Sequence, residues 1–270
     1  MTKIAHMSGV VELVDAMPST TVDTDAPDIF IGRIARSARE SLLLKEKRDS
    51  GEITKSTWEL DERLVRYLAK SDPMHSSPFE HVTLSFEITA PLAVAVHVFR
   101  HRTFSYNAFS HRYANALNAP CYVPPRQAIR GQTAMNKQAS GEILPDHLVD
   151  SCIEELTAAY ANCLASYTRL IELGLARERA RFVLPEGMLT GWVMTGNLLN
   201  FARFLRTRGA LDLAFESPVQ EETRSVAAAI HSIMHIVAPI TMNMLDEYVI
   251  GAKMLPMSKV NALRDDGRLR

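Results

Sequence analysis

The sequence has no long apolar run and almost no net charge. Its longest apolar-leaning stretch, residues 91–99, is about half as long as a membrane-spanning helix and contains His97, and the first residues lack the apolar segment of a signal peptide. The formal net charge is −1, so no overall field attracts nucleic acid or an acidic membrane. We therefore expect no membrane and no nucleic acid as partner, and any anion site must come from locally clustered basic side chains.

Cysteine is also scarce. Cys121, Cys152 and Cys163 include no pair at metal-ligand spacing, and joining two of them would leave the third unpaired. A reducing, cytoplasmic location is therefore expected. Cys121 is interpreted as a buried strand residue, and Cys152 and Cys163 as core residues on the apolar side of a long predicted helix.

Histidine is more frequent, and it raises the question of a metal. The candidates considered are those of the first half of the chain: His75, His81, His97, His101 and His111. No pair lies four residues apart on a clear helix with an acidic partner, the arrangement that typically binds zinc. The sequence therefore predicts no metal site.

The pattern predicts a single α+β domain over residues 1–270. Strict apolar/polar alternation at 82–89 predicts a half-buried strand, and residues 121–123 a short second one. Helical periodicity covers 58–70, 91–99, 145–173, 175–184, 188–206 and 218–248. Two stretches, about 16–28 and 126–144, are expected to be loops, and 251–270 a solvated tail. A sheet in the first half thus precedes long helices in the second.

The densest polar cluster runs from Arg100 to Tyr113 and reads RHRTFSYNAFSHRY. It holds three arginines, two histidines, two serines and one asparagine, and arginine can bind phosphate oxygens through two parallel hydrogen bonds. Composition alone leaves two alternatives, a solvated basic turn or an RNA-binding patch in which the aromatic residues stack on bases. The spacing of these residues along the chain favours a specific nucleotide site over both alternatives.

Arg100-His101-Arg102, followed after seven residues by Ser110, resembles the RHR-x7-S signature of the flavin-dependent thymidylate synthases, the ThyX family. The extended family pattern is matched at all but one of its fixed positions. Further segments agree in order: 9–15 resembles the first strand of the family, 75–81 its H-x-[ST]-P-F-E-H segment, 179–185 its A-R-x-V-L-P turn, and Asn197 with Arg208 its N-x10-R segment. The resemblance covers about residues 9–250.

The resemblance implies a ThyX-like fold with a central, mostly antiparallel sheet, in a homotetramer whose active sites lie between subunits. It implies FAD as cofactor, NADPH as reductant and methylenetetrahydrofolate as carbon donor, for methylation of carbon 5 in a uridine 5'-monophosphate, UMP or dUMP. By match, Arg208 would be catalytic. The nucleotide would be bound by His97, Arg100, Ala108, Phe109, Ser110, His111, Arg112, Arg181 and Arg208. The flavin would be bound by His75, Ser77, Glu80, His101, Arg102, Thr103, Asn107, Asn197 and Arg203.

Departures from the family pattern bear on both ligands. The glutamate that lies beside the nucleotide sugar in the family is Ala108 here, which removes a carboxylate acceptor and opens space for a 2′-hydroxyl. An offshoot of the family methylates UMP in the biosynthesis of polyoxin-type nucleoside antibiotics. His97 replaces a glutamine, while Leu199 and Arg203 replace an arginine and an asparagine on the flavin side. UMP methylation, strict conversion of dUMP to dTMP, and a non-catalytic nucleotide- or RNA-binding relative therefore remain open.

Overall fold

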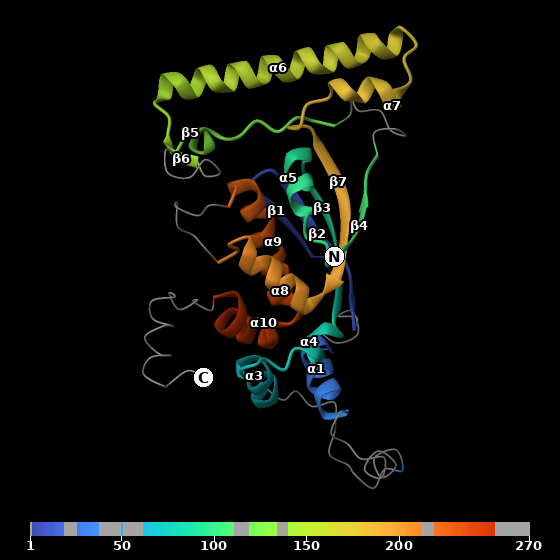
Figure 1. Cartoon of the computed structure of the whole chain (residues 1–270), viewed down its shortest axis with the longest axis vertical. Coiled ribbons are helices and arrows are strands. Elements are labelled where there is room, and N and C mark those ends of the chain that lie inside the picture. The colour runs from blue at the N-terminus through green and yellow to red at the C-terminus, as the bar shows by residue number, and fades with distance from the viewer. Residues whose placement is uncertain are drawn as a thin grey trace, which may run out of the picture.

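The computed structural model describes residues 2–18, 26–37, 50, 62–110, 119–133, 140–211 and 219–251. His111 and Arg112, most of the expected loop at 16–28 and nearly all of the expected tail lie outside these ranges. Within them, five strands form one sheet in the order β1-β2-β3-β7-β4, and helices pack on one of its faces (Figure 1). The predicted α+β class with an antiparallel sheet is confirmed.

Every neighbouring pair of strands in the sheet is antiparallel. The strands are β1 (Lys3–His6), β2 (Gly9–Met17), β3 (Thr83–Pro91), β7 (Leu189–Asn197) and β4 (Ser105–Ala108). In β3 the side chains of Leu84, Phe86 and Ile88 are fully buried, while Ser85 and Glu87 point to the opposite face. This confirms the strand predicted at 82–89, whereas β1 was not predicted.

The helix predicted over 188–206 is wrong in its first half. Residues 189–197 form β7, which pairs with β3 along its whole length and with β4 on its other side. Thr190, Trp192 and Met194 are buried while Gly191 and Val193 between them are half-buried, the period-two pattern of a strand. The prediction began too early because the apolar residues of the following helix α8 (Leu198–Thr207) continue the apolar residues of β7 without a break in the sequence. Gly191 and Gly196 and the β-branched residues between them are the strand signal.

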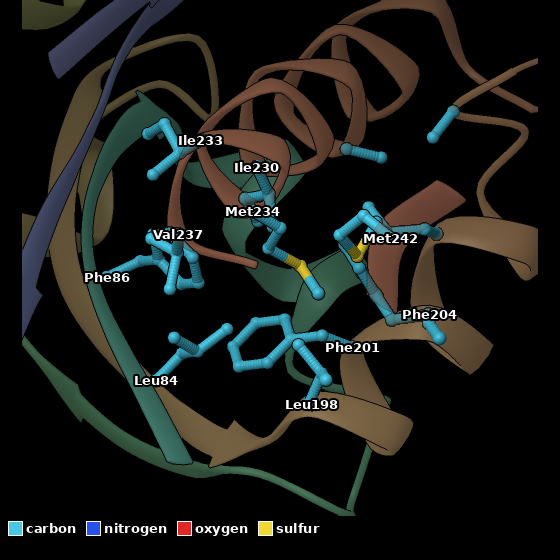
Figure 2. Close-up of a cluster of buried hydrophobic side chains, with 14 of the residues drawn as sticks. Leu84, Phe86, Leu198, Phe201, Phe204, Ile230, Ile233, Met234, Val237 and Met242 are labelled. Atoms are coloured by element: carbon cyan, nitrogen blue, oxygen red, sulfur yellow. The ribbon is translucent and has the colours of Figure 1, made fainter. Parts of the chain in front are cut away.

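The core lies between the sheet and a layer of helices formed by α5 (Leu92–Val98), α8, α9 (Glu221–Val237) and α10 (Pro239–Leu245). Figure 2 shows Leu84 and Phe86 of β3 facing Phe201 of α8 and Met234 of α9. Full burial of one such side chain contributes about 1.5–3 kcal/mol. Pro239 divides the helix predicted over 218–248 into α9 and α10, since proline cannot continue a helical hydrogen-bond ladder.

Three further helices close the end of the sheet near the start of β3. They are α1 (Ala26–Ser37), α3 (Glu62–Lys70) and α4 (Ser77–Glu80). The helix predicted over 58–70 is therefore confirmed from Glu62 onward, and its first residues lie outside the described ranges. After α10, the chain makes a π-helical turn, η4 (Asp246–Ile250).

The longest helix, α6 (Asp146–Glu172), buries little of its surface. Val149 and Tyr167 are buried, whereas Leu148 is exposed, and Cys152 and Cys163 are only half-buried. The helix predicted over 145–173 is confirmed, but the interpretation of Cys152 and Cys163 as core residues is wrong because α6 lies apart from the main body of the sheet (Figure 1). None of the helices in the described ranges is long and apolar enough to cross a membrane.

The segments around α6 correct three smaller predictions. The predicted loop 126–144 contains a 3-10 turn (Arg126–Ala128) and a small hairpin of β5 (Arg130–Gln132) and β6 (Ser140–Ile143). Residues 175–184 form only α7 (Arg177–Ala180) and the 3-10 turn η3 (Arg181–Val183). Cys121 forms an isolated bridge to Met188 rather than part of a strand, and it is half-buried.

Candidate active site

Arg208 ends helix α8 and is held between two histidines. Its Nε donates to Nε2 of His101 at 2.8 Å, and its Nη1 donates to Nε2 of His97 at 2.7 Å. Its Nη2 donates to the backbone oxygen of His97 at 3.4 Å. His97 lies in α5 and His101 shortly after it, so two segments far apart in the chain meet here. These three predicted site residues are therefore brought together.

The geometry fixes the protonation of the two imidazoles. An arginine only donates, so both Nε2 atoms accept and both rings are neutral. The Nδ1 of His97 then donates to Oγ1 of Thr223 in α9, at 3.1 Å. Burial, followed by the positive charge of Arg208, lowers the pKa of His97 and lowers that of His101 to about 4. At neutral pH the cluster therefore carries a single positive charge, on Arg208.

The contacts of Arg208 leave it able to bind a ligand. A guanidinium has five N–H groups, and three of them have the partners named above. Within the described residues, one N–H on each terminal nitrogen is left to donate. Burial lowers the pKa of Arg208, but an arginine keeps its proton in proteins. The residue is thus a fixed cation with two donors that face no described acceptor.

Tyr106 supports this cluster from the neighbouring strand β4. Its hydroxyl donates to the carbonyl oxygens of Val98 at 3.0 Å and His101 at 2.9 Å. Burial raises the pKa of Tyr106 to about 12, so it remains a donor throughout the physiological range. The ring of His101 also meets Phe204 of α8 edge-on, with 4.9 Å between centroids. The turn between α5 and β4 is therefore fixed at both ends.

The polar motif forms the edge strand of the sheet. In β4, Ser105 lies opposite Thr195 and Ala108 opposite Trp192. Since strand side chains alternate, Tyr106 and Ala108 point to the helix-covered face, and Ser105 and Asn107 to the other. The predicted flavin residue Asn107 and the predicted nucleotide residue Ala108 therefore lie on opposite faces of the sheet.

Residues predicted to bind flavin gather at the C-terminal end of β7. Asn197 lies opposite Thr83, at the start of β3, and α4 directly precedes that strand. Helix α4 also contacts α8, on which Arg203 is exposed. The side chains of His75, Ser77, Glu80, Arg102 and Thr103 are exposed as well.

Asn197 has a structural role at this corner. Its Oδ1 accepts from the backbone N–H of Asn200 at 2.8 Å and so caps α8. The side chain of Asn200 in turn donates to the carbonyl of Thr103 at 3.3 Å. These bonds connect the start of α8 to the segment that follows Arg100-His101-Arg102.

The remaining predicted residues are more scattered. Arg181 lies in η3, which packs against α6, far from α4 in Figure 1. Arg100 and Phe109 are exposed and Ser110 is half-buried, while the backbone N–H of Phe109 donates to Gly191 at 2.8 Å. Leu199 is only 1% exposed, so the position where the family has a flavin-side arginine faces the core here.

Two residues of the cluster were missed by sequence reasoning. Tyr106 lies inside the motif, but was considered only as a stacking platform. Thr223 contacts His97 across 126 residues of chain, and no local pattern indicates that contact. The sequence indicates only that Thr223 lies in the first turns of a strongly helical segment.

Comparison with known proteins shows the family of this chain. Residues 14–240 match the family model described as thymidylate synthase complementing protein. The chain belongs to the family of flavin-dependent thymidylate synthases. It is an enzyme of that type.

The similar relatives are flavin-dependent thymidylate synthases from diverse organisms. The chain is 33% identical to that of Thermotoga neapolitana over 247 residues, which cover 92% of this chain and 95% of the relative. It is 32% identical to that of Treponema denticola over 258 residues, covering 95% and 86%. With that of Ruegeria pomeroyi the identity is 34% over 210 residues, covering 76% of this chain and 66% of the relative.

Two similar solved structures show the UMP/dUMP methylase PolB from Streptomyces cacaoi. The one bound with 5-Br UMP has a TM-score of 0.69 and 28% identity, covering 88% of this chain and 93% of that chain. The one bound with 5-Br dUMP has a TM-score of 0.70 and 29% identity, covering 90% and 97%. The ThyX-like fold expected from the motif is thereby confirmed.

Proposed function

We propose that this protein methylates carbon 5 of uridine 5'-monophosphates and accepts both UMP and dUMP. FAD would be its cofactor, methylenetetrahydrofolate the carbon donor and NADPH the reductant. The observation that carries the proposal is Arg208, a fixed cation between the neutral rings of His97 and His101 in a chain of this family. The substitution of the family's glutamine by His97 therefore preserves a hydrogen-bonding partner for Arg208.

The chemistry requires such a cation. Carbon 5 of uracil becomes nucleophilic when negative charge develops on N3 and the neighbouring carbonyl oxygens. A guanidinium held in place stabilises that charge without changing its own protonation. The neutral imidazoles orient Arg208 and add no competing positive charge. Because Arg208 remains charged in every step, its part in the reaction is electrostatic.

The residues at α4 and the start of α8 fit a flavin nucleotide. Arg102 and Arg203 are exposed cations that suit a diphosphate. Ser77 and Glu80 offer a hydroxyl and a carboxylate to the sugar or the heterocycle. A flavin bound there would supply the hydride that reduces the transferred carbon unit. The protein's own contribution is to bind and orient the two ligands.

We place this site between subunits of a homotetramer. Asn107 and Ala108 face opposite sides of one strand, so a single pocket in one chain cannot be lined by both. The face that Asn107 shares with Ser85 and Thr195 has no helix packed on it among the described elements (Figure 1). A second copy that covers this face would explain the polar side chains there. Arg181, on the arm formed with α6, could then serve a neighbouring subunit, which mixed tetramers of R181A and R208Q chains would test through partial recovery of activity.

Ala108 supports the acceptance of a ribonucleotide. Its side chain is exposed and ends at Cβ, so nothing at this position excludes a 2′-hydroxyl. The PolB structures contain a bromo analogue of each nucleotide, which makes strict dUMP specificity the weaker alternative. The buried Leu199 and the partnered His97 are compatible with an active enzyme and do not require a non-catalytic relative.

The test incubates the purified protein with FAD, NADPH, methylenetetrahydrofolate and either UMP or dUMP, and follows the products by mass. We expect a gain of one methylene unit on both nucleotides. Ala108→Glu should lower the UMP/dUMP ratio of kcat/KM at least tenfold, and Ala108→Gln, of similar size, separates charge from bulk. A gain on dUMP alone contradicts dual specificity, and no gain on either contradicts the proposed activity.

A further inference from the structure

A second cluster of ionisable side chains lies in α9, beyond Thr223. His231 and His235 are four residues apart and face Asp246, the first residue of η4. Nε2 of His231 lies 2.8 Å and 3.0 Å from the two carboxylate oxygens of Asp246, and Nε2 of His235 lies 2.7 Å from one of them. One ligand atom from each residue can be chosen so that all lie within 4.8 Å of one another.

We propose that His231, His235 and Asp246 bind one divalent transition-metal ion, with zinc as the best-fitting species. Two imidazoles and a carboxylate are the donor set of mononuclear zinc sites, with a fourth position for water. Two histidines four residues apart place both rings on one side of a helix. Magnesium and calcium prefer sites made entirely of oxygen ligands, so the nitrogen donors select against them.

The present geometry needs little change to admit the ion. Zinc–ligand bonds of about 2.0–2.1 Å in a tetrahedral site separate neighbouring ligand atoms by about 3.3 Å. The nitrogen–oxygen distances are now 2.7–3.0 Å, so they would open by roughly 0.3–0.6 Å. The two rings are 4.6 Å apart at an angle of 67° and do not stack face to face. All the ligand atoms lie within 4.8 Å of one another, so side-chain rotations can bring them together, and each Nε2 must lose the proton that it donates to Asp246 before it binds the ion.

The surroundings favour a specific site over a chance surface cluster. The side chains of His231, Asp246 and His235 are 15%, 22% and 29% exposed. The carbonyl of Asp246 accepts from Gly251 at 2.8 Å, which closes the π-helical turn, and π-helical turns occur often at functional sites. The neighbouring Arg66 is paired with Glu247 at 3.1 Å, so its charge is already balanced and does not oppose a cation.

The position in the fold suggests what the ion does. His231 lies eight residues after Thr223 on the same helix, or about 12 Å along its axis. The ion would fasten α9 to η4, while Thr223 at the other end of α9 holds His97 of the active site. The metal thus stabilises the helix that positions His97, without itself contacting substrate.

The direct test is calorimetric titration of zinc chloride into the full-length protein after removal of metals with EDTA and dialysis. We expect one zinc per chain, with a micromolar or tighter Kd. His235→Gln and Asp246→Asn should each weaken binding at least 100-fold. His147→Gln, which removes an exposed histidine of α6, is the matched control and should not change Kd. Absence of stoichiometric binding to the wild type, or unchanged binding in both ligand variants, overturns the proposal.

Cobalt provides a second readout that does not depend on the variants folding. In the wild type, Co²⁺ bound in a four-coordinate nitrogen–oxygen site should give strong visible d–d bands that zinc abolishes by competition. Weak bands typical of hexahydrated cobalt would mean that the three side chains form only a hydrogen-bonded bridge, and would overturn the proposal. Circular dichroism and urea unfolding in EDTA show whether each variant is folded before its affinity is interpreted.

Discussion

Two clusters in this molecule place a charged side chain between two histidines, with opposite signs. Arg208 lies between His97 and His101 and donates to both rings. Asp246 accepts from His231 and His235 instead. The first arrangement keeps its imidazoles neutral and leaves a cation able to bind an electron-rich ring. In the second, each Nε2 can bind a metal ion beside the carboxylate oxygens once it has lost the proton that it donates to Asp246, so the central residue decides which class of ligand fits.

The two clusters also differ in how they shift the pKa values of their histidines and carboxylate. Burial and Arg208 both lower the pKa of His101. For Asp246, burial raises the pKa, but hydrogen bonds from His231 and His235 outweigh burial and bring it below its ordinary value. The Asp246 cluster thus favours the charged form of its central residue, whereas the Arg208 cluster favours the neutral form of its two histidines.

Removing the central cation should have the largest effect. Arg208→Gln keeps a hydrogen-bonding side chain but removes the charge, so kcat for methylation should fall at least about 100-fold, as for loss of one preorganised donor. Arg206→Gln, on an exposed position of the same helix, is the control and should change kcat little. Single-turnover rates with UMP and dUMP measure this, and a loss below tenfold in Arg208→Gln would contradict an electrostatic role.

Removing the central anion should affect stability more than activity. Asp246→Asn, studied in EDTA, loses charge-assisted hydrogen bonds that are worth about 1.5–3 kcal/mol each, and partial exposure places the expected loss at the lower end. Urea unfolding at unchanged m-value measures it. Asp150→Asn, at an exposed carboxylate paired with Arg126, should lower stability far less. Equal losses in the two variants would show that the Asp246 cluster contributes no more than a surface ion pair.

The neutral histidines predict how stability depends on pH. The pKa of His101 is lowered from 6.5 to about 4 in the folded chain, so between these values the unfolded chain binds more protons than the folded one. The free energy of unfolding should therefore fall as the pH drops from 6.5 to 4. His101→Gln should remove part of this slope. Urea titrations of both proteins at pH 7 and 4.5 test it, and identical slopes would mean that His101 titrates normally.

The sequence predicted correctly the helices and strands that have strong local periodicity. The predictions were wrong where tertiary packing determines whether a segment is helix or strand, or whether it is buried. The alternation in β3 and the long apolar pattern of α6 were read correctly. The interior strand β7 was predicted to be helical because the apolar residues of α8 follow it directly. The local sequence of α6 shows that the helix has an apolar face, but it does not show whether that face packs on the sheet of the same chain. The exposure of α6 was therefore not predictable.

The candidate site shows the same division. Arg208 was predicted as a site residue only from the family resemblance. Its contact with His97 could not be predicted from the sequence, since the two residues lie 111 positions apart. His231 and His235 had a visible signal, four-residue spacing within the segment predicted helical at 218–248. The prediction of no metal site rests only on histidines of the first half, so it does not include this pair, and it stays a prediction. Asp246 joins them through the reversal at Pro239, which spacing alone does not predict.

Tyr106 offers the smallest and most local test of the Arg208 cluster. Tyr106→Phe removes the donor shared by Val98 and His101, so stability should fall by about 0.5–1.5 kcal/mol. If the hydroxyl positions His101 behind Arg208, kcat should fall severalfold with little change in KM. Tyr122→Phe, which removes a longer 3.4 Å bond to Glu222, is the control.

Since burial raises the pKa of Tyr106 to about 12, the wild-type rate should show no tyrosine ionisation near pH 10. An alkaline limb that Tyr106→Phe abolishes would mean that the phenol titrates in the active enzyme, and its role would then be acid–base rather than positional.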